Sequence, residues 1–297
     1  MIWADTCIQQ ILSAKILVEF AKILGRENED AVIVLKNEIE DLTKAVNNLL
    51  WNDEDSFYYD LYKDNTHNKV KSVGAFWALL ADILPKGRIE PFVAHLENEN
   101  EFKRTHRVPS LSADHPSYNE RGDYWKGSVW APTNYMVLKG LEKNGYNDLA
   151  YEIACNNLEN VVSVYNDTKT LWENYAPEVI ERGCVAKSEF VGWSGIFPIS
   201  IMFEYVFGIR PMARERKIVW YVNRLERHGV VNYPLGDLSL DIVCNERKSA
   251  NEEPVIDINC SEKVIIEVHY NGKTVTFSHR VNTGYYRYEL HEGVNIS

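Results

Sequence analysis

The sequence predicts a mainly α-helical fold that is followed by a small antiparallel β-sheet. Apolar residues recur at spacings of three and four through most of residues 1–210, which indicates amphipathic helices. After Pro211, short runs of β-branched residues alternate with turn residues, which is typical of strands. The 297 residues are 45% hydrophobic and 25% charged, the composition of a folded globular protein. We therefore expect a helical domain over residues 1–210 and a β-rich cap over residues 211–297.

Seven helices are expected in the first part. The first covers residues 8–24 and stops at Gly25, and the second covers residues 28–50. The apolar stripes of these two helices are Ile8, Ile11, Leu12, Ile16, Phe20, Ile23 and Leu24, and Ala31, Val34, Leu35, Ile39, Leu42, Val46 and Leu49. Further helices are expected over residues 73–84, 87–96, 130–143, 147–164 and 193–207. The loops 105–129 and 165–192 exceed the usual limit of ~12 to 15 residues, and such loops commonly carry function.

The second part contains six strand-like runs, KIVWYV, GVVNYPL, LSLDIVC, PVIDINC, VIIEVHY and KTVTFSH. Asn271-Gly272, between the last two, is a favourable hairpin turn. A structural cap that buries one apolar face is the simpler interpretation of this sheet, and a binding module is the alternative.

The charge balance argues against a nucleic-acid partner. Asp and Glu number 43 against 32 Lys and Arg, which gives a formal net charge of -11, and an acidic surface repels phosphates. No apolar run approaches the ~20 residues of a membrane span, and residues 1–25 contain charges that a signal peptide lacks. We expect no membrane partner and a cytoplasmic location.

No cofactor or metal is expected. The five cysteines, which we interpret as buried thiols, are scattered without a CxxC pair or a histidine at ligand spacing: Cys7, Cys155, Cys184, Cys244 and Cys260. His106 and His115 lie in one loop without a second ligand at metal spacing. Motifs for a nucleophilic serine, a zinc protease or nucleotide binding do not occur.

Aromatic residues are unusually frequent in polar, glycine-rich segments. They make up 12% of the chain, with 8 Trp and 17 Tyr, and they gather in residues 121–135, 171–175 and 190–195. A sugar presents an apolar CH face and a rim of hydroxyls, so a site for it combines flat rings with hydrogen-bonding side chains. These segments supply both, which favours a carbohydrate ligand.

Several motifs in these segments resemble the C-terminal half of glycoside hydrolase family 63 enzymes and their relatives, mannosylglycerate hydrolase, processing α-glucosidases and trehalase. They are YWKGSVWAPTNY, GLEKNGY, ENY and FVGWSGIFPISIMFEYVFGI, preceded by FAKILGRENEDA, LLWNDEDSFYYD, FWALL and VPSLSADHPSY. The resemblance covers residues 5–211. It implies an (α/α)6 barrel of twelve helices, or six-hairpin toroid, and an inverting reaction between two carboxyl groups ~6.5 to 9.5 Å apart.

The resemblance also implies roles for individual residues. The glutamate of the family's E-N-Y loop is the general base, and Glu173 occupies that position. The residues expected to line the sugar subsite are Trp125, Lys126, Asn134, Tyr135, Tyr175 and Trp193, with Tyr59 and Trp77 as weaker candidates.

The general acid of the family is an aspartate in a motif similar to W-x-S-G-x-D-x-S-P, ahead of the helix that aligns with residues 5–24. We expect this chain to lack that motif and about five helices of the barrel, so that the barrel is incomplete at its N-terminus. Asp114 and Asp123 are possible substitutes, although both positions are typical of turn-capping aspartates. Half a barrel would expose apolar helix flanks, so we expect a homo-oligomer or a separately encoded N-terminal half.

The leading hypothesis is a glycoside hydrolase that acts on an α-linked glucoside or mannoside. A non-catalytic carbohydrate-binding or structural remnant of such an enzyme is the alternative. A sugar isomerase or epimerase would need histidine bases at the pocket, and neither of the two main aromatic segments, 121–135 and 171–175 with 190–195, contains a histidine.

Overall fold

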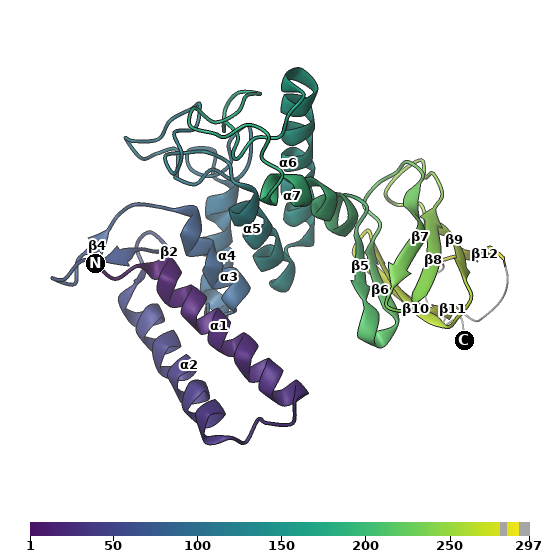
Figure 1. The fold of residues 1–297 in the computed structure, drawn as a ribbon, viewed down its shortest axis with the longest axis horizontal. Helices are drawn as coiled ribbons and strands as arrows, with labels where there is room; N and C mark the ends of the chain where they lie inside the picture. Colours follow the sequence, from purple (N-terminus) through teal and green to yellow (C-terminus); the bar gives the residue numbers. More distant parts are fainter. Residues whose placement is uncertain (280–283, 291–297) are drawn as a thin grey trace. The chain divides into compact units, whose positions relative to one another are not determined.

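The computed structural model describes residues 1–279 and 284–290. The chain divides into two compact units, Met1–Pro198 and Ile199–Ser297. The helical pattern of the sequence gives way to strands at β5 (Ile209–Met212). The coarse expectation of a helical part followed by a β part is confirmed (Figure 1).

Seven α-helices lie in the described residues: α1 (Ala4–Ile23), α2 (Asp30–Leu49), α3 (Trp77–Ala81), α4 (Lys86–Ala94), α5 (Ala131–Lys143), α6 (Asn147–Thr168) and α7 (Trp193–Ile201). Their positions agree with the seven predicted helices. The helix predicted over residues 73–84 is shorter, because its first turn, Val73–Phe76, is a 3-10 helix and Asp82 ends α3 in the left-handed conformation. The turn-rich segment after α2 forms two small ribbons, β1 (Trp51–Asn52) with β2 (Phe57–Tyr58) and β3 (Asp60–Leu61) with β4 (His67–Asn68).

The core of the first unit is centred on four phenylalanines that are completely buried, Phe57, Phe76, Phe92 and Phe102. Phe57 stacks on Phe102 with ring centroids 6.2 Å apart, and Phe76 meets Phe92 at 4.9 Å. The rings come from β2, the turn before α3, α4 and the following loop, so this cluster joins four segments that are separate in the sequence.

The α1–α2 hairpin differs from the prediction. Of the first expected stripe, Ile8 and Ile11 are buried, whereas Ile16, Phe20, Ile23 and Leu24 are exposed. The physical reason is that α1 is apolar on nearly every side, so periodicity does not identify the face that packs. The buried face of α1 continues instead through small and branched side chains, Ala14, Val18 and Ala21. In α2 only Val46 is buried.

The second unit holds the strands β5, β6 (Lys217–Tyr221), β7 (His228–Leu235), β8 (Leu238–Cys244), β9 (Val255–Cys260), β10 (Val264–Tyr270), β11 (Lys273–His279) and β12 (Tyr286–Glu289). They form two four-stranded sheets, β11-β10-β6-β5 and β12-β9-β8-β7. The predicted antiparallel pairing is confirmed for β5 with β6, β7 with β8, β8 with β9, β9 with β12 and β10 with β11. The strands lie in two sheets where one was predicted, and β10 pairs with β6 in parallel. The predicted hairpin is confirmed: Asn271 and Gly272 both have positive φ, at 46° and 71°, between β10 and β11.

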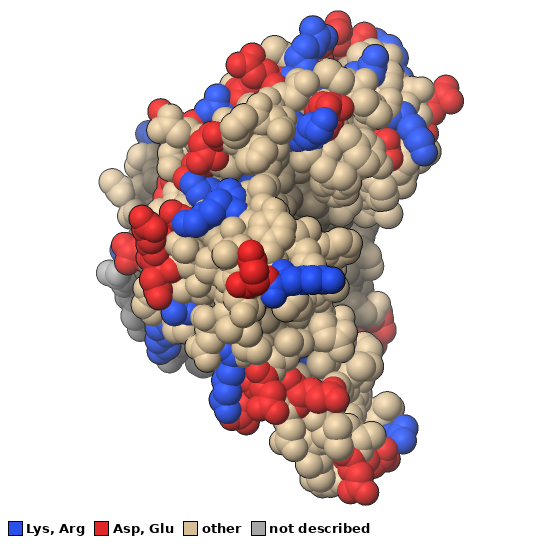
Figure 2. Space-filling model, turned by 90° about the vertical axis from the view of Figure 1, so that its left-hand side faces the viewer, with Lys and Arg blue, Asp and Glu red and all other residues tan. Residues whose placement is uncertain are grey.

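Acidic and basic side chains alternate over the face of the molecule drawn in Figure 2, with uncharged surface between them. No helix within residues 1–279 and 284–290 has the length and apolar character needed to span a bilayer.

Candidate active site

Two long loops carry the aromatic segments of the sequence, residues 98–130 before α5 and residues 169–192 before α7. Backbone hydrogen bonds join them: the amide of Val129 donates to the carbonyl oxygen of Tyr175 at 2.8 Å, and the amide of Tyr175 donates back at 3.0 Å. Figure 1 shows the loops together beside α5 and α6, away from the α1–α2 hairpin. Segments that are about 50 residues apart in the sequence therefore form one surface.

Tight backbone approach at this junction explains the glycines of the loops. A side chain at Gly183 would place its Cβ 1.9 Å from the amide oxygen of Asn174, next to Glu173. Gly122 has a φ of 71°, and a Cβ there would lie 2.8 Å from the hydroxyl of Ser128. Neither position has room for a larger residue, so the loop conformation around Glu173 depends on these two glycines.

Glu173 lies in the second loop, and only 6% of the residue is exposed. Its amide donates to the carbonyl oxygen of Lys187 at 2.9 Å, and the amide of Lys187 lies 3.4 Å from its Oε2 atom. The indole N–H of Trp193 donates to the carbonyl oxygen of Glu173 at 2.9 Å. Glu173 is thus held by hydrogen bonds to the backbone of Lys187 and to the indole of Trp193. Its role as a general base stays a prediction.

Five rings that contact one another in series form what we call the aromatic platform, and Trp193 among them donates to Glu173: Tyr124, Trp125, Trp130, Phe190 and Trp193. Trp125 stacks on Trp130 with centroids 4.6 Å apart and planes 17° apart. Trp130 lies 6.2 Å from Trp193, which contacts Phe190 at 4.6 Å. Trp125 is 55% exposed and Trp193 is 39% exposed. The platform therefore offers flat apolar surface to solvent, the kind of surface that receives the CH face of a sugar.

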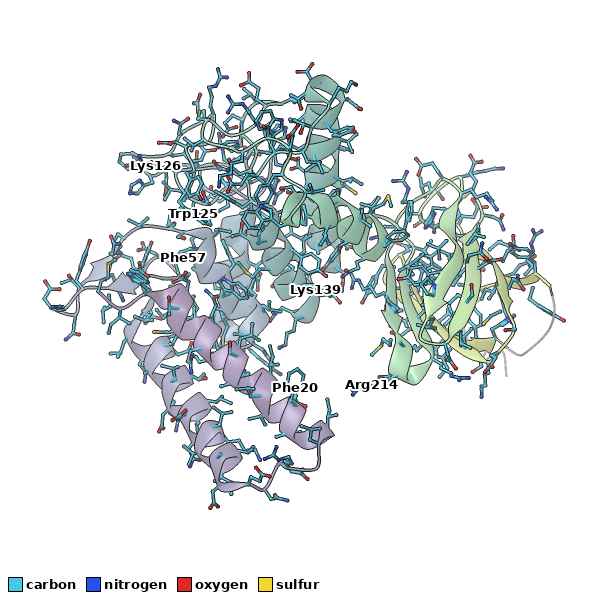
Figure 3. All side chains as sticks on the ribbon, in the orientation of Figure 1. Phe20, Phe57, Trp125, Lys126, Lys139 and Arg214 are labelled. Atoms are coloured by element: carbon cyan, nitrogen blue, oxygen red, sulfur yellow. The ribbon has the colours of Figure 1, made fainter. Side chains whose placement is uncertain are left out.

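Lys126 and Tyr135 lie near this platform in the sequence but differ in environment. Lys126 projects from the first loop next to Trp125 (Figure 3), and its Nζ atom lies 3.2 Å from the carboxylate of Asp123. This ion pair is exposed, so the lysine can exchange Asp123 for a ligand hydroxyl at little cost. Tyr135 is half-buried on the first turns of α5.

Asn134 and Tyr175 do not lie at the exposed part of the platform. The amide of Asn134 is completely buried, where it accepts from the backbone N–H of Val108 at 2.6 Å and donates to the carbonyl oxygens of Val108 and Trp130. Tyr175 packs among Val129 and neighbouring apolar residues, and burial raises the pKa of its hydroxyl. Both polar groups are bound inside the protein, and the expected contact of these two residues with sugar stays a prediction.

The weaker candidates Tyr59 and Trp77 lie outside the platform. Tyr59 is buried, with the ammonium of Lys69 5.5 Å from its ring centroid. Trp77 is half-buried as the first residue of α3. Among the described residues, neither side chain forms a ring pair with any of the five platform rings.

Asp114 is a poor candidate for a general acid, which must be protonated when it acts. The carboxylate of Asp114 lies 3.0 Å from the Nζ atom of Lys71. Burial acts to raise the pKa of Asp114, but Ser112 and Lys71 outweigh it and hold that pKa below its ordinary value. Asp123 pairs with Lys126 at the surface. The lowered pKa of Asp114 favours its ionised form.

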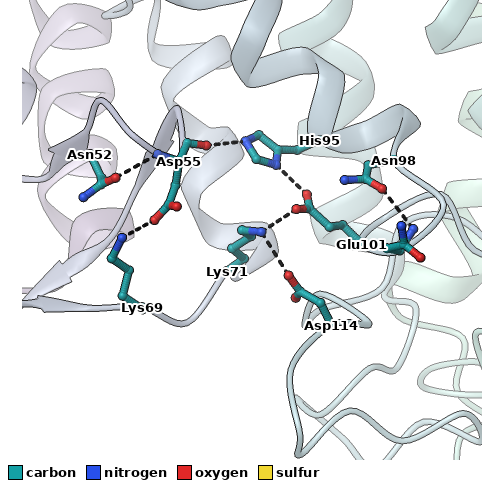
Figure 4. A network of polar contacts seen from close by, with 9 residues as sticks. Asn52, Asp55, Lys69, Lys71, His95, Asn98, Glu101 and Asp114 are labelled. Carbon is teal, nitrogen blue, oxygen red and sulfur yellow. Dashed lines mark hydrogen bonds and ion pairs between the residues drawn. The ribbon is translucent and has the colours of Figure 1, made fainter.

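A buried polar network was not predicted from the sequence (Figure 4). Glu101 is buried, forms an ion pair with Lys71 and is hydrogen-bonded to Nδ1 of His95, and the second ring nitrogen of His95 lies 2.9 Å from the carbonyl oxygen of Asp55. Burial acts to raise the pKa of Glu101, but the bonds to His95 and Lys71 lower it overall. Through these contacts, Glu101 at the start of the first loop is connected to Asp55 and Lys71 in the segment after α2.

The structure thus adds Tyr124, Phe190 and the Glu101 network to the residues found by sequence reasoning. Phe190 had a usable signal, since it stands three residues before Trp193 in the quoted motif. Glu101 had none, because its partners Lys71 and His95 lie in different segments. In the described part of the chain no three His, Cys, Asp or Glu residues are placed to hold a metal ion.

Comparison with known proteins shows the family. Residues 4–194 match the mannosylglycerate hydrolase MGH1-like glycoside hydrolase domain. A Borreliella burgdorferi protein is 27% identical over 80% of this chain and 52% of its own length. A probable mannosyl-oligosaccharide glucosidase of Schizosaccharomyces pombe is 25% identical over 52% of this chain and 21% of its own length.

A solved structure shares the fold. The GH63 mannosylglycerate hydrolase from Thermus thermophilus, in complex with glucose, superposes with a TM-score of 0.56 at 21% identity, over 67% of this chain and 46% of that one. The match of residues 4–194 to the family model places the helical unit in the glycoside hydrolase class. Within this class, the chain belongs to the mannosylglycerate hydrolase MGH1-like family, which confirms the resemblance to family 63. The chain spans about half the length of the Borreliella and Thermus proteins.

Proposed function

We propose that this chain carries the base-bearing half of a glycoside hydrolase that cleaves an α-linked glucoside or mannoside with inversion. The observation that supports it best is Glu173, a buried carboxylate whose loop is hydrogen-bonded to Trp193 of the aromatic platform. The family membership supports the reaction class. We also propose that the first unit represents part of an (α/α)6 barrel.

In this proposal the platform binds one face of the sugar, and Lys126 hydrogen-bonds a hydroxyl at its rim. Glu173 removes a proton from water on the face opposite the departing group, and the water oxygen forms the new bond to the anomeric carbon. The leaving oxygen needs a proton from an acid, and Asp114 and Asp123 both pair with lysine side chains instead. Residues outside this chain would then supply the acid.

Glycosyl fluorides test the base without the acid, because fluoride leaves without being protonated. We expect the chain to hydrolyse α-glucosyl or α-mannosyl fluoride and to release the β-anomer first, which proton NMR detects. Glu173→Gln keeps the size of the side chain but not its basicity, so the rate should fall at least about 100-fold.

Glu189→Gln is the matched control, since Glu189 is exposed in the same loop and its loss should leave the rate unchanged. Equal rates in wild type and Glu173→Gln would contradict the assignment of the base. Release of the α-anomer would contradict inversion.

The alternative is a non-catalytic carbohydrate-binding remnant, which the exposed surface of Trp125 and Trp193 would equally serve. It predicts glucose or mannose binding, followed by tryptophan fluorescence, with no hydrolysis of either fluoride. In that case Trp125→Ala should weaken sugar binding while Glu173→Gln should not abolish it. Absence of both binding and hydrolysis would contradict both functions.

A further inference from the structure

The outer face of the sheet β12-β9-β8-β7 carries a hollow of about 460 Å³. This volume lies within the roughly 300 to 1,000 Å³ of sites that hold small molecules. Its lining comes from these four strands and from the residues directly before β7 and β12: Arg227, Val231, Val243, Asp257, Tyr285 and Arg287. All six residues belong to the second unit, whereas Glu173 and the aromatic platform belong to the first.

The strand pattern places polar side chains on this face in register. Val243, Asp257 and Arg287 lie directly opposite one another on β8, β9 and β12. Asp241 and Asn259 form the next pair on the same side of β8 and β9, because side chains two residues apart point to the same face of a sheet. The residues that alternate with them are buried in the core of the second unit: Ile242, Cys244, Ile256 and Ile258. The hollow therefore lies on the side of the sheet that faces away from the core.

Two carboxylates fix the side chains around the hollow. Asp257 accepts hydrogen bonds from Nε and Nη2 of Arg287 at 2.9 and 3.2 Å, and from the amide of Asn245 at 3.0 Å. Asp241 accepts from the hydroxyl of Tyr285 at 2.7 Å. Arg287 and Tyr285 are thus held in place before a ligand arrives, which lowers the entropy lost on binding.

Tyr285 and Arg227 leave binding groups open to solvent. Tyr285 is 61% exposed although its hydroxyl is bonded, so its ring presents an apolar face. Arg227 is also exposed, and its guanidinium has no hydrogen bond or ion pair within residues 1–279 and 284–290. It nevertheless lies near Asp257: the hydrogen bond from Arg287 lowers the pKa of that carboxyl most, and the charge of Arg227 adds to the effect. A flat ring, free N–H donors and carboxylate acceptors thus converge on one hollow.

The charges of these groups favour an uncharged ligand. Arg227 and Arg287 are balanced by Asp241 and Asp257, so the hollow has no net charge to attract an anion or a cation. A sugar ring matches the arrangement, since its CH face packs on a phenol ring and its hydroxyls both donate and accept hydrogen bonds. We propose that this hollow is a second carbohydrate-binding site, which takes an uncharged saccharide. The choice of glucose or mannose units as its ligand rests on the proposed function.

Backbone amide NMR of the full chain tests this proposal, with maltotriose and mannotriose as the probes. The Glu173→Gln chain is used so that hydrolysis cannot consume the sugar, and the amides of Val243 and Asp257 report on this hollow rather than on the platform. We expect their signals to shift with one of the two sugars. Arg227→Gln removes free N–H donors and should raise the dissociation constant about 10-fold. Tyr285→Ala removes the ring and should have a similar effect.

The matched control is Arg214→Gln, which changes another exposed arginine of the second unit, on the 3-10 turn between β5 and β6 (Figure 3), and should leave binding unchanged. Unchanged signals in the rest of the spectrum confirm that each variant is folded. Amide shifts confined to the first unit, or no shifts, would overturn the proposal. Shifts at Val243 that Arg227→Gln does not weaken would overturn it too, as would a response to galacturonate in place of both neutral sugars. A wild type that shows these shifts but does not hydrolyse the fluorides would contradict the proposed function alone.

Discussion

Two helical hairpins of similar length in the first unit, α1–α2 and α5–α6, differ in how many of their residues are buried. The 22 residues of α6 include eight that are buried, whereas the 20 residues of α2 include one. Both sequences have an apolar periodicity that predicts a helix. The difference shows that a helical pattern in the sequence does not reveal whether anything covers the apolar face.

The α5–α6 hairpin also carries buried asparagines that bind the first loop. Within α5–α6, Asn157 donates to the amide oxygen of Asn134 at 3.2 Å, and Asn134 binds the backbone of the first loop. This hairpin therefore supports the first of the two long loops. The α1–α2 hairpin instead leaves many of its apolar side chains exposed.

The largest expected effect comes from a core isoleucine. Ile153 on α6 is completely buried and Ile33 on α2 is about half exposed. Ile153→Ala should lower the free energy of unfolding by about 4 kcal/mol, since it leaves a cavity, and Ile33→Ala by less than about 1 kcal/mol. Urea unfolding of dilute protein, followed by the helical circular dichroism signal, measures both. Similar losses would show that the two hairpins are equally packed.

A second comparison uses two glutamates. Glu101→Gln removes the charge that faces Lys71 and His95 inside the protein and should cost about 3 kcal/mol of unfolding free energy. Glu38→Gln, on the exposed side of α2, should change it by less than about 0.5 kcal/mol. The same urea experiment applies. A neutral result for Glu101→Gln would mean that the network adds no stability.

The pH dependence of unfolding should show a smaller effect of Glu101. The folded-state pKa of Glu101 lies below its ordinary value, so its stabilising contribution is complete above the unfolded pKa of about 4.5 and is lost as pH falls through the lower, folded pKa. Wild type should therefore lose unfolding free energy below about pH 4.5 more steeply than Glu101→Gln. Parallel pH profiles for the two proteins would contradict this origin of acid sensitivity.

The sequence alone determined the local elements and the family. Periodicity located the seven helices, the Asn271-Gly272 dipeptide identified the hairpin between β10 and β11, and the quoted motifs identified the family. The loop segments around Trp125 and Glu173 were also located in this way. These features depend on residues close together in the chain, where side-chain spacing and turn conformation have local causes.

Only the tertiary structure decided which of these residues are accessible and which are bound internally. It placed Asn134 and Tyr175 in the interior, left Phe20 exposed, and paired β6 with β10 in parallel. It also brought Glu101 to partners from other segments. Burial and pairing depend on contacts between segments far apart in the chain, and a local pattern states that a face is apolar without stating what covers it.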